Sequence, residues 1–323
     1  MCGEREADLI STRSRHGSNL RTVACLGCGL LRNDPIPSEL ELRQFYETTY
    51  RMSYKGVREP KPKHVARGGC LAVARFRALR GYLQGTGRVL DIGSGSGEWL
   101  YLLKRNGIDA IGLDPDPSWA AFSRRELGID ISAGTFNDAR FPPQSFQMVT
   151  LFHVLEHLRD PVRAISQCLT WLTDKGHLII EVPNLASPHQ HPQKRFHPAH
   201  LFGFVPATLA FAARRAGGHP VEIRTDSFSR NITAVIRKSE SAADAGRTSP
   251  GPSRQEVAEV LAAVKEQPLF TYYASAATFR RFVLRMRQFT REQTAVWQKR
   301  HAREILDTLF QDAAGDFREA EHR

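Results

Sequence analysis

The stretch VLDIGSGSG, residues 89–97, decides the fold of this chain. A short apolar strand is expected over residues 88–92 and a helix over residues 98–105, so the glycines lie at the junction between them. Glycines at such a junction let the backbone turn sharply and let a ligand approach the main chain closely. Because ligands of open parallel sheets bind at the carboxyl ends of the strands, the stretch predicts a binding loop.

The spacing of this loop indicates the kind of ligand. Gly93, Gly95 and Gly97 follow the pattern G-x-G-x-G, whereas the dinucleotide fingerprint is G-x-G-x-x-G. Asp91 stands just before the loop, where a carboxylate would repel a pyrophosphate but can pair with a cation. Asp114 ends the next expected strand, and an acid there can accept hydrogen bonds from both ribose hydroxyls. The loop therefore favours an uncharged or cationic nucleoside over NAD.

Strands alternate with helices along the middle of the chain. Helices are expected to begin at Asp116-Pro117 and at Asp160-Pro161, each an N-cap followed by proline at the first helical position. This alternation predicts βαβ units and a parallel sheet. The last two strands have no helix between them, so one of them should run antiparallel. The six strands expected are residues 88–92, 109–113, 147–152, 176–182, 221–225 and 231–237.

The loop, the acid after it and the alternation resemble the class I S-adenosylmethionine-dependent methyltransferases over residues 65–237. The resemblance implies an α/β fold with a Rossmann-like, doubly wound, seven-stranded and mostly parallel sheet. It implies that the glycine loop with Asp91 holds the methionine part of the cofactor and that Asp114 binds the ribose. Thr135 and Phe136 would then lie beside the adenine, although the family often has an acid where Thr135 stands.

The segment LEHLRDP, residues 155–161, resembles the LEHL-x-DP signature of one branch of that family, whose members often act on small molecules or on glycan and lipid precursors. The resemblance places His153 beside the cofactor and the segment from His200 to Phe204 on the acceptor side. A hydroxyl acceptor needs a base, and a histidine suits that role near neutral pH. The candidates are His157 and His200, and each could instead hydrogen-bond to the backbone and shape the loop.

A divalent metal site is a second interpretation of the same segment. His153, Glu156 and His157 could present three ligands on one turn, with His200 or His197 as a fourth. The segment resembles an acid-x-x-Glu-His grouping that holds a divalent ion in some related methyltransferases. Here His153 stands in place of the first acid, which lowers the affinity expected for Mg²⁺.

The N-terminal region contains a cysteine pair that is typical of half a zinc ribbon. Cys25 and Cys28 form a C-x-x-C unit, and Cys2 lies upstream. The branch often carries such a ribbon with four cysteines, so three leave a tetrahedral zinc one ligand short. Tyr46 and Tyr50 follow and are candidates for a lid.

Composition sets the remaining expectations. The sequence predicts that the 323-residue chain has four parts. They are a degenerate ribbon-like segment with a lid (1–60), the methyltransferase domain (61–238), a flexible linker (239–253) and a helical C-terminal extension (254–323). The extension is expected to contain helices from residue 253, over 279–289 and over 292–310. No stretch is apolar enough for a membrane span, and the N-terminus lacks a signal-peptide core, which together predict a cytoplasmic protein.

The sequence is compatible with four functions. The preferred one is methyl transfer to a small-molecule or to a sugar- or lipid-linked acceptor. The net charge of +11 keeps an RNA or other nucleic-acid methyltransferase as an alternative, although no catalytic motif for base methylation is found. An inactive binding module with this fold and an NAD-dependent enzyme are the others. The oligomeric state is left open.

Overall fold

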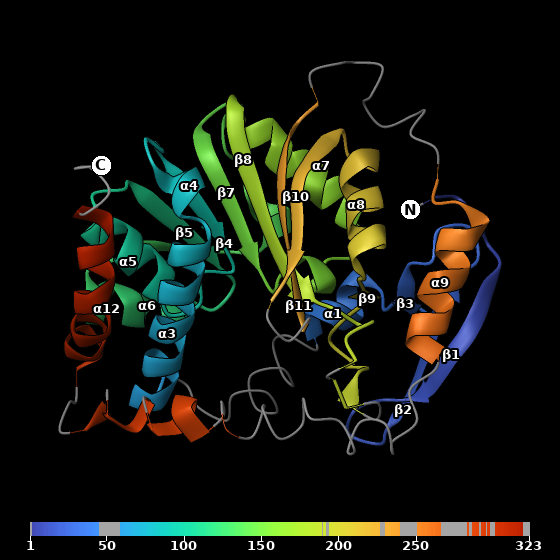
Figure 1. Cartoon of the computed structure of the whole chain (residues 1–323), viewed down its shortest axis with the longest axis horizontal. Helices are drawn as coiled ribbons and strands as arrows, with labels where there is room; N and C mark the ends of the chain where they lie inside the picture. Colours follow the sequence, from blue (N-terminus) through green and yellow to red (C-terminus); the bar gives the residue numbers. More distant parts are fainter. Residues whose placement is uncertain are drawn as a thin grey trace. The chain divides into compact units, whose positions relative to one another are not determined.

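The chain forms two compact units. One comprises Met1–Thr48 and Leu151–Arg280, and the other comprises Thr49–Thr150 and Arg281–Arg323. Figure 1 shows the elements in chain order. The computed structural model describes residues 2–44, 59–188, 190–191, 194–226, 230–239, 251–265, 283, 286–290, 292–294, 296–297 and 301–318.

A seven-stranded sheet has the strand order β10-β11-β8-β7-β4-β5-β6. Strands β4, β5 and β6 pair in parallel, whereas β11 pairs antiparallel with both β8 and β10. The predicted seven-stranded, mostly parallel sheet with an antiparallel edge is thus confirmed. The strands are β4 (Val89–Ile92), β5 (Ala110–Asp114), β6 (Ile131–Ala133), β7 (Phe146–Phe152), β8 (Leu172–Pro183), β10 (Gly218–Thr225) and β11 (Asn231–Lys238).

Local sequence signals start and end the helices of the unit that holds the glycine loop. The Asp116 carboxylate accepts a hydrogen bond from Ser118 N at 3.0 Å and caps α6. The C-terminal helix α12 packs closely on α3, because a side chain at Gly69 would meet Leu306 and Leu309 at 2.6 and 2.9 Å. The helical segments are α3 (Pro62–Ala78), α4 (Arg80–Leu83), α5 (Glu98–Arg105), α6 (Pro117–Leu127), η2 (Phe136–Asp138) and α12 (Ala302–Arg318).

The other unit contains a second, antiparallel sheet with the order β1-β2-β3-β9. Its strands are β1 (Ala7–Arg13), β2 (Asn19–Cys25), β3 (Leu31–Asn33) and β9 (Phe202–Gly203). None of these four strands was among the expected ones, and residues 1–60 were expected only to form a ribbon-like segment with a lid. The helical segments here are α1 (Glu39–Gln44), η3 (Leu155–His157), α7 (Pro161–Trp171), α8 (Pro206–Arg215) and α9 (Arg254–Lys265).

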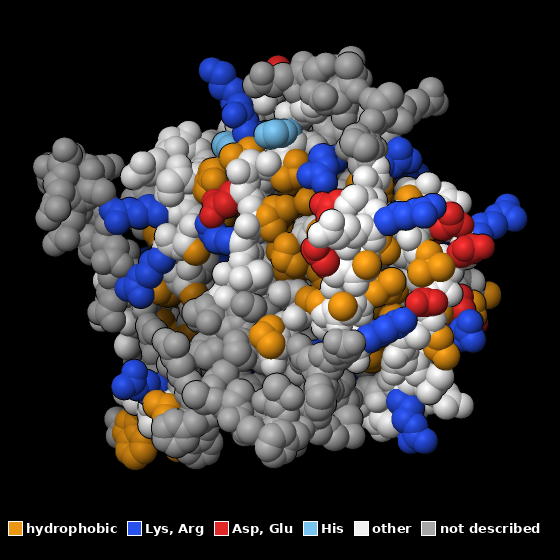
Figure 2. All heavy atoms as spheres, turned by 45° about the vertical axis from the view of Figure 1, so that its right-hand side comes forward, with side chains coloured by type: hydrophobic (Ala, Val, Ile, Leu, Met, Phe, Trp, Pro, Cys, Tyr) orange, Lys and Arg blue, Asp and Glu red, His pale blue; other side chains and the backbone are white. Residues whose placement is uncertain are grey.

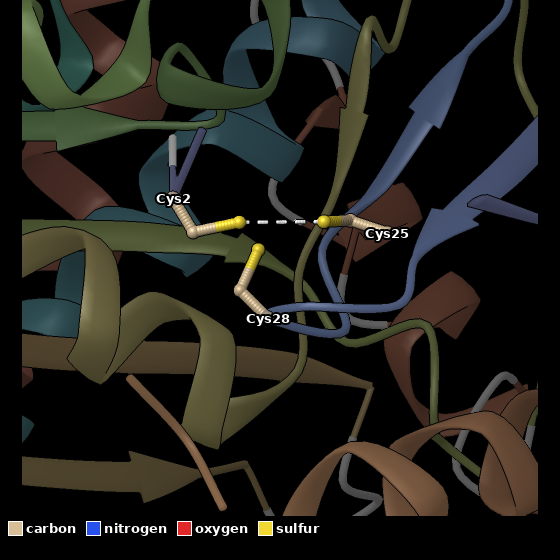
Figure 3. A group of neighbouring side chains, drawn as sticks. All are labelled: Cys2, Cys25 and Cys28. Carbon is tan, nitrogen blue, oxygen red and sulfur yellow. Dashed lines mark hydrogen bonds between the residues drawn. The ribbon is translucent and has the colours of Figure 1, made fainter. Parts of the chain in front are cut away.

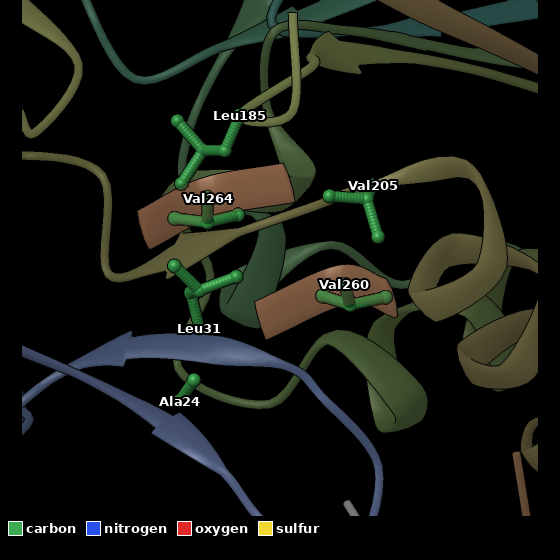
Figure 4. Close-up of a cluster of buried hydrophobic side chains, with 6 residues drawn as sticks. All are labelled: Ala24, Leu31, Leu185, Val205, Val260 and Val264. Carbon is green, nitrogen blue, oxygen red and sulfur yellow. The ribbon is translucent and has the colours of Figure 1, made fainter. Parts of the chain in front are cut away.

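Helix α9 covers an apolar cluster of this small sheet. Val260 and Val264 of α9 point toward Leu31 of β3 (Figure 4). The expected helix from residue 253 is therefore present, and its apolar face has a partner within the chain. The six buried members of the cluster are Ala24, Leu31, Leu185, Val205, Val260 and Val264.

Several expectations lie outside the described residues. They are the lid residues Tyr46 and Tyr50, most of the linker and most of the helix over 279–289. Within the last expected helix, over 292–310, residues 292–294 and 296 are helical, and α12 (Ala302–Arg318) then runs eight residues past the predicted end. The predicted domain boundaries stay a prediction. In the described part of the chain, no helix combines the length and apolarity needed to cross a membrane.

Candidate functional site

The three loop glycines adopt left-handed backbone conformations. Gly93, Gly95 and Gly97 have φ values of +73°, +57° and +87°, a region that L side chains rarely occupy. Gly97 is also the N-cap of α5, and a side chain there would clash with the Ser123 hydroxyl. The loop geometry therefore requires glycine at these positions, as the motif predicted.

The Asp114 carboxylate braces this loop. Gly95 N donates to Asp114 Oδ2 at 2.8 Å, and Asp116 N donates to Asp114 Oδ1 at 2.9 Å. Asp114 ends β5, which pairs with β4 directly before the loop. The acid therefore lies beside the loop, with its oxygens held in place by main-chain amides.

Asp91 is a buried acid at the end of β4. Burial raises its pKa to about 7, although the Thr150 hydroxyl, which donates to Asp91 Oδ1 at 2.6 Å, acts in the opposite direction. Ser94 Oγ donates to the Asp91 carbonyl at 2.7 Å and ties the loop to the strand. A desolvated carboxylate of this kind gains most from a cation placed next to it.

Thr135 and Phe136 follow β6, the strand next to β5. Gly134 N donates to the Asp114 carbonyl at 2.9 Å, which brings this turn next to the acid. Thr135 Oγ1 donates to Asp138 Oδ2 at 2.5 Å. The carboxyl ends of three adjacent parallel strands therefore carry the glycine loop, Asp114 and Thr135, in the place where such sheets bind ligands.

His153 is held between two carboxylates of the other unit. Its backbone has φ +58°, unusual for a residue with a side chain, and its ring nitrogens lie 3.4 Å from Glu156 Oε1 and 3.2 Å from Glu181 Oε1. Burial lowers the pKa of His153, but the hydrogen bonds to Glu156 and Glu181 outweigh burial and raise it to about 9. His153 is therefore an imidazolium at neutral pH.

His157 and His200 meet beside Glu156. The His157 Nδ1–H donates to the Ala199 carbonyl at 2.8 Å, which leaves His157 Nε2, 3.9 Å from Glu156 Oε1, as the nitrogen that can accept a proton. The rings of His157 and His200 pack edge to face with centroids 4.9 Å apart. Burial and the nearby His157 lower the pKa of His200 to about 3, so His200 is neutral.

Three side chains of this cluster have the spacing of metal ligands. One ligand atom each from Glu156, His157 and His200 lies within 4.8 Å of the others. Burial alone would raise the pKa of Glu156, but His153, His157 and His200 together lower it, so the carboxylate is charged. His153 pairs with carboxylates instead of joining this group, and His197 accepts a hydrogen bond from Ala199 N through Nδ1 at 3.0 Å.

The three N-terminal cysteines point toward one another (Figure 3). Cys2 Sγ lies 3.4 Å from Cys25 Sγ, and the sulfurs of Cys2, Cys25 and Cys28 all lie within 4.8 Å of one another. Gly29 N donates to the Cys25 carbonyl at 2.8 Å and closes the turn between the paired cysteines. Burial raises the pKa of the Cys28 thiol. The three cysteines also line a cavity of about 330 Å³.

Comparison with known proteins relates the central part of the chain to a known family. Residues 64–221 match a family model described as "Methyltransferase domain". A "Probable S-adenosylmethionine-dependent methyltransferase" of Mycolicibacterium smegmatis is 33% identical over 97 residues, 30% of this chain and 38% of the relative. Residues 64–221 thus match the methyltransferase-domain family, over a little less than half of the chain.

Other relatives of the methyltransferase domain have lower identity. A "Ubiquinone biosynthesis O-methyltransferase" of Yersinia pestis is 27% identical over 172 residues, 45% of this chain and 71% of the relative. A solved methyltransferase from Archaeoglobus fulgidus is 21% identical, with a TM-score of 0.46 over 60% of this chain and 100% of its own. This chain spans less than half the length of several curated relatives, 38–46%.

Two polar residues of the site, Thr150 and Glu181, were not among the expected site residues. Thr150 on β7 donates to Asp91, and Glu181 on β8 pairs with His153. Glu181 gave a usable signal, because it is the one acid in the apolar run Leu178–Val182. Thr150 gave none, since a threonine in a β-strand is ordinary.

Proposed function

We propose that this protein transfers a methyl group from S-adenosylmethionine to a hydroxyl of a small-molecule or a sugar- or lipid-linked acceptor. The observation that carries the proposal is the glycine loop braced by Asp114, next to the buried Asp91. The acceptor class is supported by relatives named ubiquinone biosynthesis O-methyltransferase, which match part of the chain at 27–28% identity.

The donor set of the loop fits the cofactor. Asp91 offers a buried carboxylate for a cationic group, and Asp114 offers carboxylate oxygens for a ribose diol. When bound, S-adenosylmethionine supplies an electrophilic methyl group on a positively charged sulfur. Thr135 and Phe136 would flank the adenine of the cofactor, and His153 would border the cofactor from the end of β7.

His157 is proposed as the base that takes the proton of the acceptor hydroxyl. The Ala199 carbonyl fixes the tautomer, so that Nε2 receives the proton. The Glu156 carboxylate, 3.9 Å away, then stabilises the imidazolium. His200 stays neutral and packs against the His157 ring, so we assign it to positioning.

The cofactor assignment is tested by calorimetric titration with S-adenosylmethionine, with NAD in parallel. We expect saturable binding of S-adenosylmethionine alone. Asp114→Ala should weaken it about ten- to hundredfold, since charged hydrogen bonds contribute roughly 1.5–3 kcal/mol. Asp109→Ala is the matched control, because that acid lies at the other end of β5 and is exposed. Failure of the intact protein to bind S-adenosylmethionine would overturn the proposal.

A zinc ion at Cys2, Cys25 and Cys28 is proposed as a second, separate site. Three converging thiols supply three of the four ligands that tetrahedral zinc takes, and the adjoining cavity leaves room for a fourth. Elemental analysis of the purified protein should find about one zinc per chain. Cys28→Ser should lose the metal, whereas Cys70→Ser, on α3, should keep it. Zinc-free wild-type protein purified with added zinc would contradict this site.

A further inference from the structure

The side chains of Cys2 and Cys25 form a close pair of thiols. Their Sγ atoms are 3.4 Å apart and point toward each other (Figure 3). Both cysteines are free thiols, so the two sulfurs are in contact without a covalent bond. A movement of roughly 1–2 Å would bring them to the bonding distance of a disulfide. A small local shift is therefore enough to join them.

The small sheet holds this pair in place. Strand β1 pairs with β2, and beyond this pairing Leu26 N donates to the Glu6 carbonyl at 3.0 Å. The segment that carries Cys2 also packs closely on the turn after β2, since a side chain at Gly27 would meet Cys2 Sγ at 3.2 Å. The strand pairing thus keeps together two thiols that are 23 positions apart in the chain.

The three thiols of the cluster differ in their access to solvent. Cys2 is partly exposed, whereas Cys25 and Cys28 are 9% and 1% exposed. All three line the cavity of about 330 Å³, roughly ten times the space of one water molecule, which admits hydrogen peroxide. Because oxidation of cysteine follows exposure, Cys2 is the thiol that an oxidant meets first. Cys25, in contact with it, is placed to react with the oxidised sulfur.

We propose that Cys2 and Cys25 are a redox-active pair that forms a reversible disulfide when a peroxide enters the cavity. The Cys2 sulfur attacks one oxygen of hydrogen peroxide, the O–O bond breaks, and hydroxide leaves as water with the Cys2 thiol proton. The Cys25 sulfur then attacks the sulfenic sulfur, the S–S bond forms, and the sulfenic hydroxyl leaves as water with the Cys25 proton. Both sulfurs are oxidised, and the peroxide is reduced to water.

The disulfide would change the ligands that the cluster can offer. It would close a loop that contains β1 and tie the segment before β1 to the end of β2. Zinc binds thiolates, so the oxidised pair would no longer supply two of the three ligands proposed for zinc. Disulfide and zinc would therefore exclude each other at these residues. The oxidation itself needs no metal, so it does not rest on the proposed zinc site.

Peptide mapping of the full chain tests the pair. The reduced protein is freed of metal with EDTA, treated with one equivalent of hydrogen peroxide, and alkylated before digestion. We expect a linked peptide that joins Cys2 to Cys25, an alkylated Cys28, and recovery of all three thiols with dithiothreitol. A predominant link between Cys25 and Cys28 would overturn the proposal. Sulfinic acid at Cys2 with Cys25 still alkylated would overturn it as well.

Serine variants distinguish the pair from the third thiol. Cys2→Ser should slow the oxidation of Cys25 at least about tenfold, because the exposed thiol that reacts first is gone. Cys28→Ser should form the Cys2–Cys25 link within about twofold of the wild-type rate. Cys70→Ser removes a partly exposed thiol of α3 and is the control for cysteine number. Equal oxidation of Cys25 in wild type and Cys2→Ser, or loss of the link in Cys28→Ser, would refute the pair.

Gly27→Ala tests whether the folded geometry sets the reaction. The new side chain would lie 2.7 Å from Glu4 Cβ and 3.2 Å from Cys2 Sγ, so it would displace Cys2. The link should then form at least about tenfold more slowly, since the reaction depends on proximity. Gly81→Ala, on α4, where a side chain meets open space, should react as wild type.

Equal rates in Gly27→Ala and wild type would show that the contact between the sulfurs does not set the reaction, and would overturn the proposal. Circular dichroism of each variant verifies that the fold is kept. Should Gly27→Ala fail to fold, the serine variants still decide.

Discussion

At the scale of single residues, we expect Asp91 to make binding of S-adenosylmethionine depend on pH. Its pKa of about 7 means that the carboxyl is partly protonated at neutral pH, and a bound cation favours the charged form. Affinity for S-adenosylmethionine should therefore rise as the pH is raised from 6 to 8, steeply below pH 7 and little above it. Calorimetry in two buffers of different ionisation enthalpy should detect proton release on binding at pH 6.5.

The control for this prediction is Asp91→Asn, which keeps an acceptor for the Thr150 hydroxyl but cannot become negative. This variant should bind the cofactor more weakly at pH 8 and show no proton release. A pH dependence that survives in Asp91→Asn would assign the proton to another group.

His157 is tested by a substitution that keeps one of its two functions. The amide of His157→Asn can still donate to the Ala199 carbonyl, but it has no equivalent of Nε2. With a hydroxyl acceptor, kcat at pH 7 should fall about 10²–10⁴-fold, the usual contribution of a general base. The affinity for S-adenosylmethionine should stay within about twofold.

The pH profile distinguishes a base from a residue that only shapes the loop. In His157→Asn, kcat should recover toward the wild-type value as the pH approaches the pKa of the acceptor hydroxyl, because the ionised acceptor needs no base. A constant ratio of the two activities across the whole pH range would assign His157 a structural role.

Single residues that act through local sequence were predictable, and those that act across the sheets were not. The glycines and Asp114 belong to one motif within a single βαβ unit, so their proximity follows from the chain itself. The pairing of His153 with Glu181 brings together the ends of two strands, and Arg195 reaches Val264 across 69 residues. Sequence alone does not set such contacts.

At the scale of elements, the turn into α5 depends on two separate properties of Gly97, its left-handed backbone and the space beside it. Gly97→Ala should lower the free energy of unfolding more than Gly107→Ala. Gly107 also has a positive φ, +75°, but a side chain there meets open space. We expect a loss of about 1 kcal/mol at Gly107 and about 2–4 kcal/mol at Gly97, where steric overlap with Ser123 adds to backbone strain.

Urea unfolding of both variants provides the measurement. The difference between the two losses isolates the packing contribution, since the backbone strain is common to both. Equal losses at Gly97 and Gly107 would show that the Ser123 side chain moves aside without cost.

Helix starts and the central strands were predictable because their signals are local. Asp116-Pro117 and Asp160-Pro161 cap α6 and α7, as the sequence indicated. Three strands of the small sheet were missed because β1 is partly exposed and because β3 and β9 have only three and two residues. Strand β6 has three residues and was missed for the same reason.

At the scale of the whole molecule, the net charge of +11 raises the question of nucleic-acid binding. On the face drawn in Figure 2, Lys and Arg side chains lie among acidic and apolar ones. A face of this kind neutralises few phosphates at a time, so RNA binding to it should weaken by no more than about tenfold between roughly 50 and 200 mM salt. Filter binding at several salt concentrations measures this slope, and a loss of about a thousandfold would support an RNA substrate instead.

The small antiparallel sheet has a consequence for the order in which the chain folds. Its first three strands end at Asn33, but its fourth is Phe202–Gly203. A ribosome must therefore add about 170 residues after β3 before the sheet can be completed. Until then the outer edge of β3 is open to other strands. The pairing of β3 with β9 has a high sequence separation, and such contacts form slowly. During synthesis, the small sheet thus stays incomplete while α3 to α7 and β4 to β8 are made, although three of its strands precede all of them.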